Sequence, residues 1–239
     1  MQRMRFCLAL LGLLLASTHS RRADAQVSDL RAVHDLAVHA MVMIENPSAG
    51  LSGSGWLLEQ TPPARPVVIT NQHVAVMARA RLRVSFYAGA DAPPTQSLAR
   101  VLWVSPTVDL AIVLLESDPP STARALTIEP GDIVRGERVV LAGDPHELAF
   151  QTSEGVVTGA LPEVDLMARC GFARNCVVVD AASWAGSSGG PALNTAGRVV
   201  GMLWGGPPGV ASFAYLIHAR TIEQELRAFG ESRHARAHD

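Results

Sequence analysis

The stretch Val177–Pro191 decides the fold, and it reads VVVDAASWAGSSGGP. A β-branched run of valines is followed there by a turn of small residues, and Gly189, Gly190 and Pro191 all disfavour a helix after it. We therefore expect the turn to display Ser188 rather than pack it. A serine hydroxyl is a weak nucleophile unless a histidine takes its proton and a carboxylate orients that histidine. The rest of the chain must supply those two partners.

His73 is the histidine best placed to be that base. It follows the apolar run Val67–Thr70, in the sequence TNQHV, where a turn after a strand can hold its ring at a domain surface. A single histidine after a strand is usually structural, so the argument for His73 depends on Ser188. The other histidines beyond the N-terminal segment fit structural positions in a helix, strand, turn or tail: His34, His39, His146, His218, His234 and His238.

Asp109 is the candidate carboxylate. It precedes the apolar run LAIVLL at residues 110–115, and an aspartate so close to a buried strand must be paired or hydrogen-bonded. Orienting an imidazole satisfies it, and so does capping backbone amides at the strand end. Asp180 is a rival, but it lies on the same local segment as Ser188 and fits better as a brace for that loop.

Five segments in chain order resemble the trypsin-like serine proteases, and the HtrA (high-temperature-requirement) branch most of all. The order His73, Asp109, Ser188 is that of chymotrypsin-type enzymes, whereas subtilisins place the aspartate first and α/β-hydrolases the serine. The resemblance extends over residues 38–226 and is carried by these segments: Gly53–Trp56, Ile69–Val74, Val108–Ala111, Gly143–Pro145 and Asp180–Pro191.

The resemblance implies an all-β fold of two six-stranded antiparallel β-barrels of the chymotrypsin type, with a short N-terminal helix and a C-terminal helix. Short β-rich runs separated by polar or proline turns independently indicate a sandwich or barrel architecture. We expect residues 26–120 to form the first barrel, with the histidine and aspartate. Residues 121–217 are expected to form the second, with the serine, and residues 218–239 a helix and tail.

Local patterns predict the element boundaries. A helix capped by Ser28 should precede a strand over Val38–Ile44, and the turn Asp118–Thr122 is the best boundary between the barrels. Helical periodicity over Ala219–Phe229 predicts the last helix, and the residues from Gly230 onward look like a frayed polar tail.

The resemblance implies a reaction as well as a fold. Ser188 would attack a carbonyl of a protein or peptide substrate, including unfolded ones, His73 would act as general base and then general acid, and Asp109 would fix the imidazole tautomer. The backbone N–H groups of Gly186 and Ser188 would form the oxyanion hole. The implied substrate-binding residues are uncharged, which predicts small or medium apolar residues before the cut: Ala182, Ser183, Trp204, Gly205 and Phe213.

Two departures from the HtrA pattern are visible. Only a helix and a tail follow the second barrel, too little chain for the C-terminal PDZ domain that the family commonly carries, so sensing or assembly through such a domain is not expected. Ser187 stands where the family usually has asparagine and digestive relatives have an aspartate that pairs with a newly cut N-terminus. Activation by that route is therefore not expected either, and the sequence indicates no oligomeric state.

The first 25 residues resemble a secretory signal peptide. Arg3 and Arg5 precede an apolar run over Phe6–Ala16, and Ala23–Ala25 offers a small-x-small cleavage site. A membrane anchor is the alternative, but the run is shorter than the ~20 residues that a spanning helix needs. We expect cleavage near Ala25 and export to a periplasm or out of the cell, with no stable membrane anchor.

Cys170 and Cys176 would remain after that cleavage. In an exported protein such a pair is more typical of a small-loop disulfide than of a metal half-site, because no second cysteine or histidine cluster stands nearby. Two free thiols are the alternative. We expect no metal and no cofactor. The chain has a formal net charge of −2 and no basic stripe, so nucleic acid is not an expected partner.

Two other functions remain open. The sequence GSSGG also fits the G-x-S-x-G turn of esterases and lipases, but that turn requires a helix after the serine, with the acid and histidine downstream. A non-helical segment over residues 191–197 and then a strand over Val199–Trp204 are expected here instead. A catalytically silent binding module on a protease scaffold is the second alternative. Such modules generally lose a member of the triad, and here all three residues are present.

Overall fold

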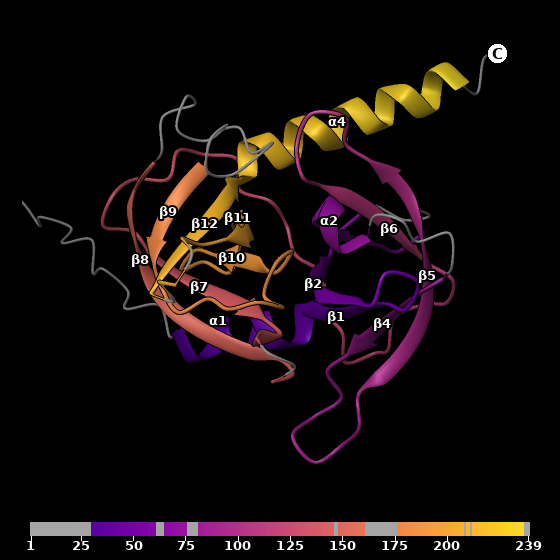
Figure 1. Cartoon of the computed structure of the whole chain (residues 1–239), viewed down its shortest axis with the longest axis horizontal. Helices are drawn as coiled ribbons and strands as arrows, with labels where there is room; N and C mark the ends of the chain where they lie inside the picture. Colours follow the sequence, from indigo (N-terminus) through magenta and orange to yellow (C-terminus); the bar gives the residue numbers. More distant parts are fainter. Residues whose placement is uncertain are drawn as a thin grey trace, which may run out of the picture.

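The computed structural model describes residues 30–60, 65–75, 81–145, 148–160, 176–207, 209–210 and 212–236. Within these ranges the chain forms two closed β-barrels that lie side by side, with one helix beneath the second barrel and another running across the top (Figure 1). The predicted signal peptide, Cys170 and the rest of the segment 161–175 lie outside the described residues.

The first barrel closes with the strand order β1-β2-β3-β6-β5-β4, and every pair in it is antiparallel. Its interior is filled by fully buried aliphatic and aromatic side chains such as Ile44, Val84 and Val113. The strands are β1 (Met41–Asn46), β2 (Leu51–Leu57), β3 (Val67–Thr70), β4 (Leu82–Phe86), β5 (Thr95–Val104) and β6 (Ala111–Leu115).

The second barrel repeats that connectivity. Its order is β10-β11-β12-β9-β8-β7, so each of its strands occupies the place of the strand six positions earlier in the chain. A separate apolar cluster, with Leu141, Val179 and Leu216 at its centre, fills it. The strands are β7 (Arg138–Gly143), β8 (Gln151–Ala160), β9 (Cys176–Asp180), β10 (Pro191–Leu193), β11 (Val199–Gly205) and β12 (Phe213–His218).

The linker between the barrels is hydrogen-bonded to both. Leu126 donates its N–H to the Leu57 carbonyl of the first barrel at 2.9 Å, and Val199 of the second barrel donates to the Thr127 carbonyl at 2.9 Å. A large apolar cluster continues through this interface, from Trp56 on one barrel to Met202 on the other. Because buried apolar surface and backbone bonds both cross this interface, the two barrels are held in a fixed relative arrangement.

The expected fold class, two six-stranded antiparallel barrels with a helix at each end, is confirmed. Within the described residues no helix is both long and apolar enough to cross a membrane. The esterase alternative required a helix after Ser188, and the strand β10 stands there instead. The structure therefore removes that alternative.

Some predicted boundaries were wrong. The helix α1 (Leu30–Ala40) includes residues 38–40, which we assigned to a strand. Packing decided this boundary, because Ala37 and Ala40 are fully buried on the same face of the helix as Val33. The helix α4 (Ala219–Arg236) continues through the predicted frayed tail at Gly230. The strand β10 was not expected, since three residues carry no readable alternation.

Candidate active site

His73 and Asp109 form a tightly joined pair on the first barrel. His73 lies on α2 (Gln72–Ala75), a single helical turn directly after β3. Its Nδ1 lies 2.6 Å from Asp109 Oδ2, and its backbone N–H donates to Asp109 Oδ1 at 2.9 Å. A carboxylate oxygen accepts and a ring N–H donates, so Nδ1 is the donor, and in the neutral tautomer this leaves the lone pair on Nε2. Asp109 therefore holds the ring of His73 in one orientation.

The loop that carries Asp109 is held from two sides. Asn71 Nδ2 donates to the Asp109 carbonyl at 2.9 Å. Ser105 Oγ accepts the backbone N–H of Val108 at 3.0 Å and donates to Glu225 Oε2 of α4 at 2.6 Å. Glu225 also accepts from Thr107 Oγ1 at 2.6 Å. The C-terminal helix thus braces a loop of the first barrel, a contact that no local sequence pattern indicates.

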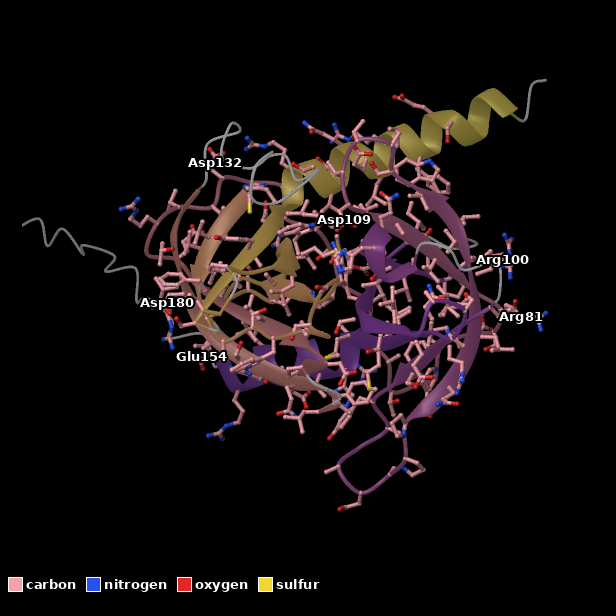
Figure 2. All side chains as sticks on the ribbon, viewed as in Figure 1. Arg81, Arg100, Asp109, Asp132, Glu154 and Asp180 are labelled. Carbon is pink, nitrogen blue, oxygen red and sulfur yellow. The ribbon has the colours of Figure 1, made fainter. Side chains whose placement is uncertain are left out.

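Asp180, the rival carboxylate, is not near this pair. It is exposed at the end of β9 and pairs in register with Phe213 of β12. Figure 2 shows Asp109 near the centre of the molecule, between the barrels, and Asp180 at the outer edge of the second barrel. Asp180 therefore cannot orient His73.

Ser188 lies on the turn between β9 and β10, and two glycines with positive φ flank its local backbone, Gly186 at 97° and Gly189 at 88°. A side chain at Gly189 would run into the carbonyl of Ser54 and the hydroxyl of Thr70. Glycine is needed at position 189 for both reasons, because positive φ disfavours other residues and no room exists for a Cβ. The turn is less displayed than expected, because Ser188 is half-buried, Ser187, Gly189 and Gly190 are buried, and the turn packs closely against the first barrel.

Gly53 of β2 brings the two halves of the site together. A Cβ placed at Gly53 would lie 2.6 Å from Val74 Cγ2, on the His73 helix, and 3.2 Å from the carbonyl oxygen of Ser188. Gly53 thus contacts both the helix that carries His73 and the turn that carries Ser188. In the described chain the Ser188 hydroxyl donates to the Trp204 carbonyl at 3.2 Å, and no hydrogen bond joins it to His73.

A pocket of about 410 Å³ opens beside Ser188, and no charged side chain lines it. Two of the predicted substrate-binding residues, Ser183 and Gly205, line this pocket. Ala182 instead lines a neighbouring cavity of about 430 Å³ behind Ser187. Trp204 and Phe213 are not among the lining residues of either pocket. The sequence reasoning missed three lining residues further along the same connection: Pro207, Gly209 and Val210.

The described residues include only one of the two cysteines of the predicted disulfide. Cys176 opens β9 and is fully buried in the main apolar cluster, while Cys170 lies outside the described residues. In the part of the chain that the structure describes, no group of three or more histidine, cysteine, aspartate or glutamate side chains is gathered as a metal site.

Residues 53–202, more than half of the chain, match the family model described as the trypsin-like peptidase domain. The chain belongs to the trypsin-like peptidase family. The matched range begins in β2 and ends in β11, so it contains the whole segment from His73 to Ser188. The resemblance inferred from the sequence motifs is confirmed.

HtrA-type proteases are among the relatives of this peptidase. Serine protease Do-like HtrA of Bacillus subtilis (strain 168) is 34% identical over 154 residues, covering 63% of this chain and 32% of that protein. Mitochondrial serine protease HTRA2 of Bos taurus is 32% identical over 155 residues, covering 63% of this chain and 31% of that protein. The peptidase chain thus spans about a third of the length of these curated relatives.

A solved structure agrees with the fold. The active form of the Rv3671c protease of M. tuberculosis matches with a TM-score of 0.65 and 25% sequence identity, covering 82% of this chain and 82% of that one. The two-barrel architecture of this peptidase is therefore that of an established protease scaffold.

Proposed function

We propose that this peptidase is a serine endopeptidase that cleaves protein substrates through an acyl-enzyme. The observation that carries the proposal is the position of Gly53, with the His73 helix against one side of it and the Ser188 carbonyl against the other. A histidine that is hydrogen-bonded to a carboxylate and a serine turn of the other barrel thus approach the same residue of β2, which supports the proposal. This arrangement is what nucleophilic catalysis by serine requires.

The proposed reaction uses each group in turn. Ser188 Oγ adds to the substrate carbonyl while its proton passes to His73 Nε2, and Asp109 stabilises the resulting imidazolium. The intermediate then breaks its C–N bond, and the leaving amine takes the proton from Nε2. Water repeats the same two steps on the acyl-enzyme and restores Ser188. The Asp109 contacts to both the ring and the backbone of His73 support this role.

The oxyanion hole is proposed at the N–H groups of Gly186 and Ser188. Gly186 has a φ of 97°, a conformation that glycine adopts readily. This turn away from an extended backbone supports the assignment. Losing one donor of such a site reduces kcat by about 100-fold to 1,000-fold.

Ser188 must turn for the reaction to start. Its hydroxyl hydrogen points to the Trp204 carbonyl at 3.2 Å, whereas attack requires it to point to Nε2. A neutral hydrogen bond contributes about 0.5–1.5 kcal/mol net, so rotation of the side chain costs little. Catalytic hydrogen bonds are often incomplete before substrate binds.

A preference for small or medium apolar residues before the cut is proposed from the pocket beside Ser188. The pocket is lined by small and apolar residues, among them Gly205, Gly206 and Val210, and it lacks the charge that would bind lysine or arginine. Export of the mature chain and a Cys170–Cys176 disulfide belong to the same proposal. The mass of the purified protein, with and without reduction, tests both the cleavage near Ala25 and the disulfide.

The proposed function is tested by incubating the purified protein with an unfolded substrate protein and mapping the new termini by mass spectrometry. The Ser188→Ala variant is prepared in parallel to exclude a contaminating protease. We expect internal cuts after small or medium apolar residues, all absent in the variant. Cuts after arginine or lysine would contradict the proposed pocket. A folded wild-type protein that cuts nothing would contradict the enzyme and favour the silent binding module.

A further inference from the structure

Ser54, in the middle of β2, connects three parts of the active site. It is fully buried, and all of its polar atoms are hydrogen-bonded. Its N–H donates to the Ser188 carbonyl at 2.8 Å, and its hydroxyl donates to the Gly186 carbonyl at 2.8 Å. The hydroxyl accepts the Asp144 N–H at 2.9 Å, and the Ser54 carbonyl accepts from Thr70 Oγ1 at 2.6 Å.

The direction of the hydroxyl bond is fixed by its partners. The backbone N–H of Asp144 can only donate, so it takes a lone pair of Ser54 Oγ. The carbonyl of Gly186 can only accept, so it receives the hydroxyl hydrogen. Ser54 therefore acts as a donor toward the nucleophile turn, and the second barrel itself, through Asp144, orients the hydroxyl for that task.

These bonds fix the peptide planes next to those of the proposed oxyanion hole. The N–H groups of Gly186 and Ser188 belong to the peptides that precede these residues, and Ser54 holds the carbonyls of the peptides that follow them. The Gly186–Ser187 peptide is held at its oxygen by Ser54 and at its nitrogen by the Trp184 carbonyl, which accepts the Ser187 N–H at 3.0 Å. Glycine has the widest backbone freedom of any residue, so Gly186 needs such external restraint to keep a single orientation. The carbonyl of Ser188, the second proposed donor residue, is held by the Ser54 N–H.

We propose that Ser54 is a positioning residue that sets the oxyanion hole across the barrel interface. It touches neither substrate nor the reacting atoms, and it acts by fixing the carbonyls of both residues whose N–H groups stabilise the oxyanion. The inference rests on the proposed function of Gly186 and Ser188. Preorganised donors lose effect when they must reorganise during the reaction, so the contribution of Ser54 should appear in the transition state and not in substrate binding.

The kinetic test uses Ser54→Ala, which removes the hydroxyl without adding atoms to a buried site. We expect kcat/KM on a peptide substrate to fall by about 10-fold to 100-fold, through kcat, with KM little changed. A peptide boronic acid, whose oxygen occupies the oxyanion position, should lose affinity in parallel, while the product peptide should not. Ser54→Cys keeps a donor at this position but a weak one, so its kcat/KM should lie between those of wild type and Ser54→Ala.

The matched control is Ser97→Ala. Ser97 is also buried, on β5 of the same barrel, and its hydroxyl is hydrogen-bonded to Ser117 Oγ at 2.8 Å, away from the nucleophile turn. The same chemical change at this position should leave kcat/KM near the wild-type value. An equal loss of kcat/KM in both alanine variants would overturn the inference, because it would reflect a general loss of stability.

An activity-independent test reads the Gly186 carbonyl directly. The chain contains two glycine–serine steps, Gly53–Ser54 and Gly186–Ser187. Protein labelled with carbonyl-¹³C glycine and ¹⁵N serine therefore gives two correlated signals, of which only the Gly186–Ser187 signal survives in Ser54→Ala. Loss of the hydroxyl bond should move that carbonyl signal upfield, and the Ser97→Ala spectrum should keep both signals in place.

The kinetic test and the carbonyl signal together distinguish a failure of this inference from a failure of the proposed function. A folded Ser54→Ala or Ser54→Cys protein with wild-type kcat/KM would overturn the inference and leave the endopeptidase intact. An unmoved Gly186 carbonyl signal in Ser54→Ala would overturn it whether or not the wild type is active. Inactivity of the wild-type protein alone would overturn the proposed function.

Discussion

The two barrels have the same strand order but use equivalent connections differently. His73 lies between the third and fourth strands of the first barrel, and Ser188 lies between the third and fourth strands of the second. Asp109 precedes the sixth strand of the first barrel, and the matching connection of the second barrel, near Val210, lines the pocket. The strands therefore supply a common frame, while the connections carry the residues of the candidate site.

The two barrels also differ in where the hydrogen bonds to their parts of the site come from. Asp109 holds His73 by two hydrogen bonds and is itself braced by Asn71. Ser188 instead sits on a turn whose hydroxyl is engaged with Trp204 and whose peptide planes depend on Ser54 of the other barrel. The direct hydrogen-bond partners of His73 thus come from its own barrel, whereas the turn that carries Ser188 depends on contacts across the interface.

The largest expected effect tests whether the two connections act as one unit. Ser188→Ala and His73→Ala should each reduce kcat by about 10⁶-fold, and the double variant should be little worse than either. Single-turnover assays of the three variants, at enzyme concentrations that reveal residual cleavage, measure this. Losses that multiply in the double variant would mean that the two residues act independently.

A smaller loss is expected when the first barrel's pair is altered without removing the base. Asp109→Asn should reduce kcat by about 10⁴-fold, because an amide can donate to Nδ1 and stabilise the wrong imidazole tautomer. Asp180→Asn is the matched control, since Asp180 is exposed on the outer edge of the second barrel. Steady-state kinetics measure kcat for both variants. Comparable losses of kcat in the two would contradict the assignment of Asp109.

Alanine substitutions at two glycines test how closely the turn around Ser188 packs against the first barrel. Gly136 has φ 92° with open space around it, whereas Gly189 has φ 88° and a crowded surrounding. Gly136→Ala should lower the free energy of unfolding by about 1–2 kcal/mol from backbone strain. Gly189→Ala should cost a further ~1–3 kcal/mol for overpacking. Denaturant unfolding measures both, and equal values would mean that the turn is not held against Ser54.

The smallest effect concerns pH and the helix that braces the Asp109 loop. His218 precedes α4, and its Nδ1 accepts the Arg220 N–H at 2.9 Å as a helix cap. Burial and then the nearby Arg220 charge lower the pKa of His218 below its ordinary 6.5, against an opposing effect of Asp132. The folded state therefore favours the neutral ring, so stability is lost as the pH falls from 6.5 toward the folded pKa.

His218→Asn isolates that effect. Asparagine caps helices well and does not titrate, so the variant should lose less thermal stability over this pH range than the wild type does. Thermal unfolding followed by circular dichroism at a series of pH values provides the comparison. Identical pH profiles for both proteins would show that His218 does not contribute.

Much of this structure was predictable from sequence because the informative residues stand at strand ends. The apolar run before His73, the run after Asp109 and the glycine turn around Ser188 each carry a local signal, and two series of short strands indicated the barrels. The contacts of Ser54 with Gly186 and of Ser105 with Glu225 join residues more than 100 positions apart. No periodicity or composition reports such a contact.

The pocket was predicted least well for the same reason. Val210 and Pro207 lie on an irregular connection whose path depends on tertiary packing, so nothing local marked them as lining residues. The length of α4 was underestimated because Gly230 is a weak helix former. The adjacent helix is held by other contacts, including Phe229 against Trp103.

The central claim is that a serine of one barrel reacts with the help of a histidine of the other. The most direct measurement is labelling of the purified protein with a fluorophosphonate, followed by peptide mass spectrometry to locate the adduct. We predict a single adduct on Ser188 in the wild type, with labelling lost in His73→Ala. No adduct on a folded wild-type protein, or an adduct that forms equally fast without His73, would contradict the account.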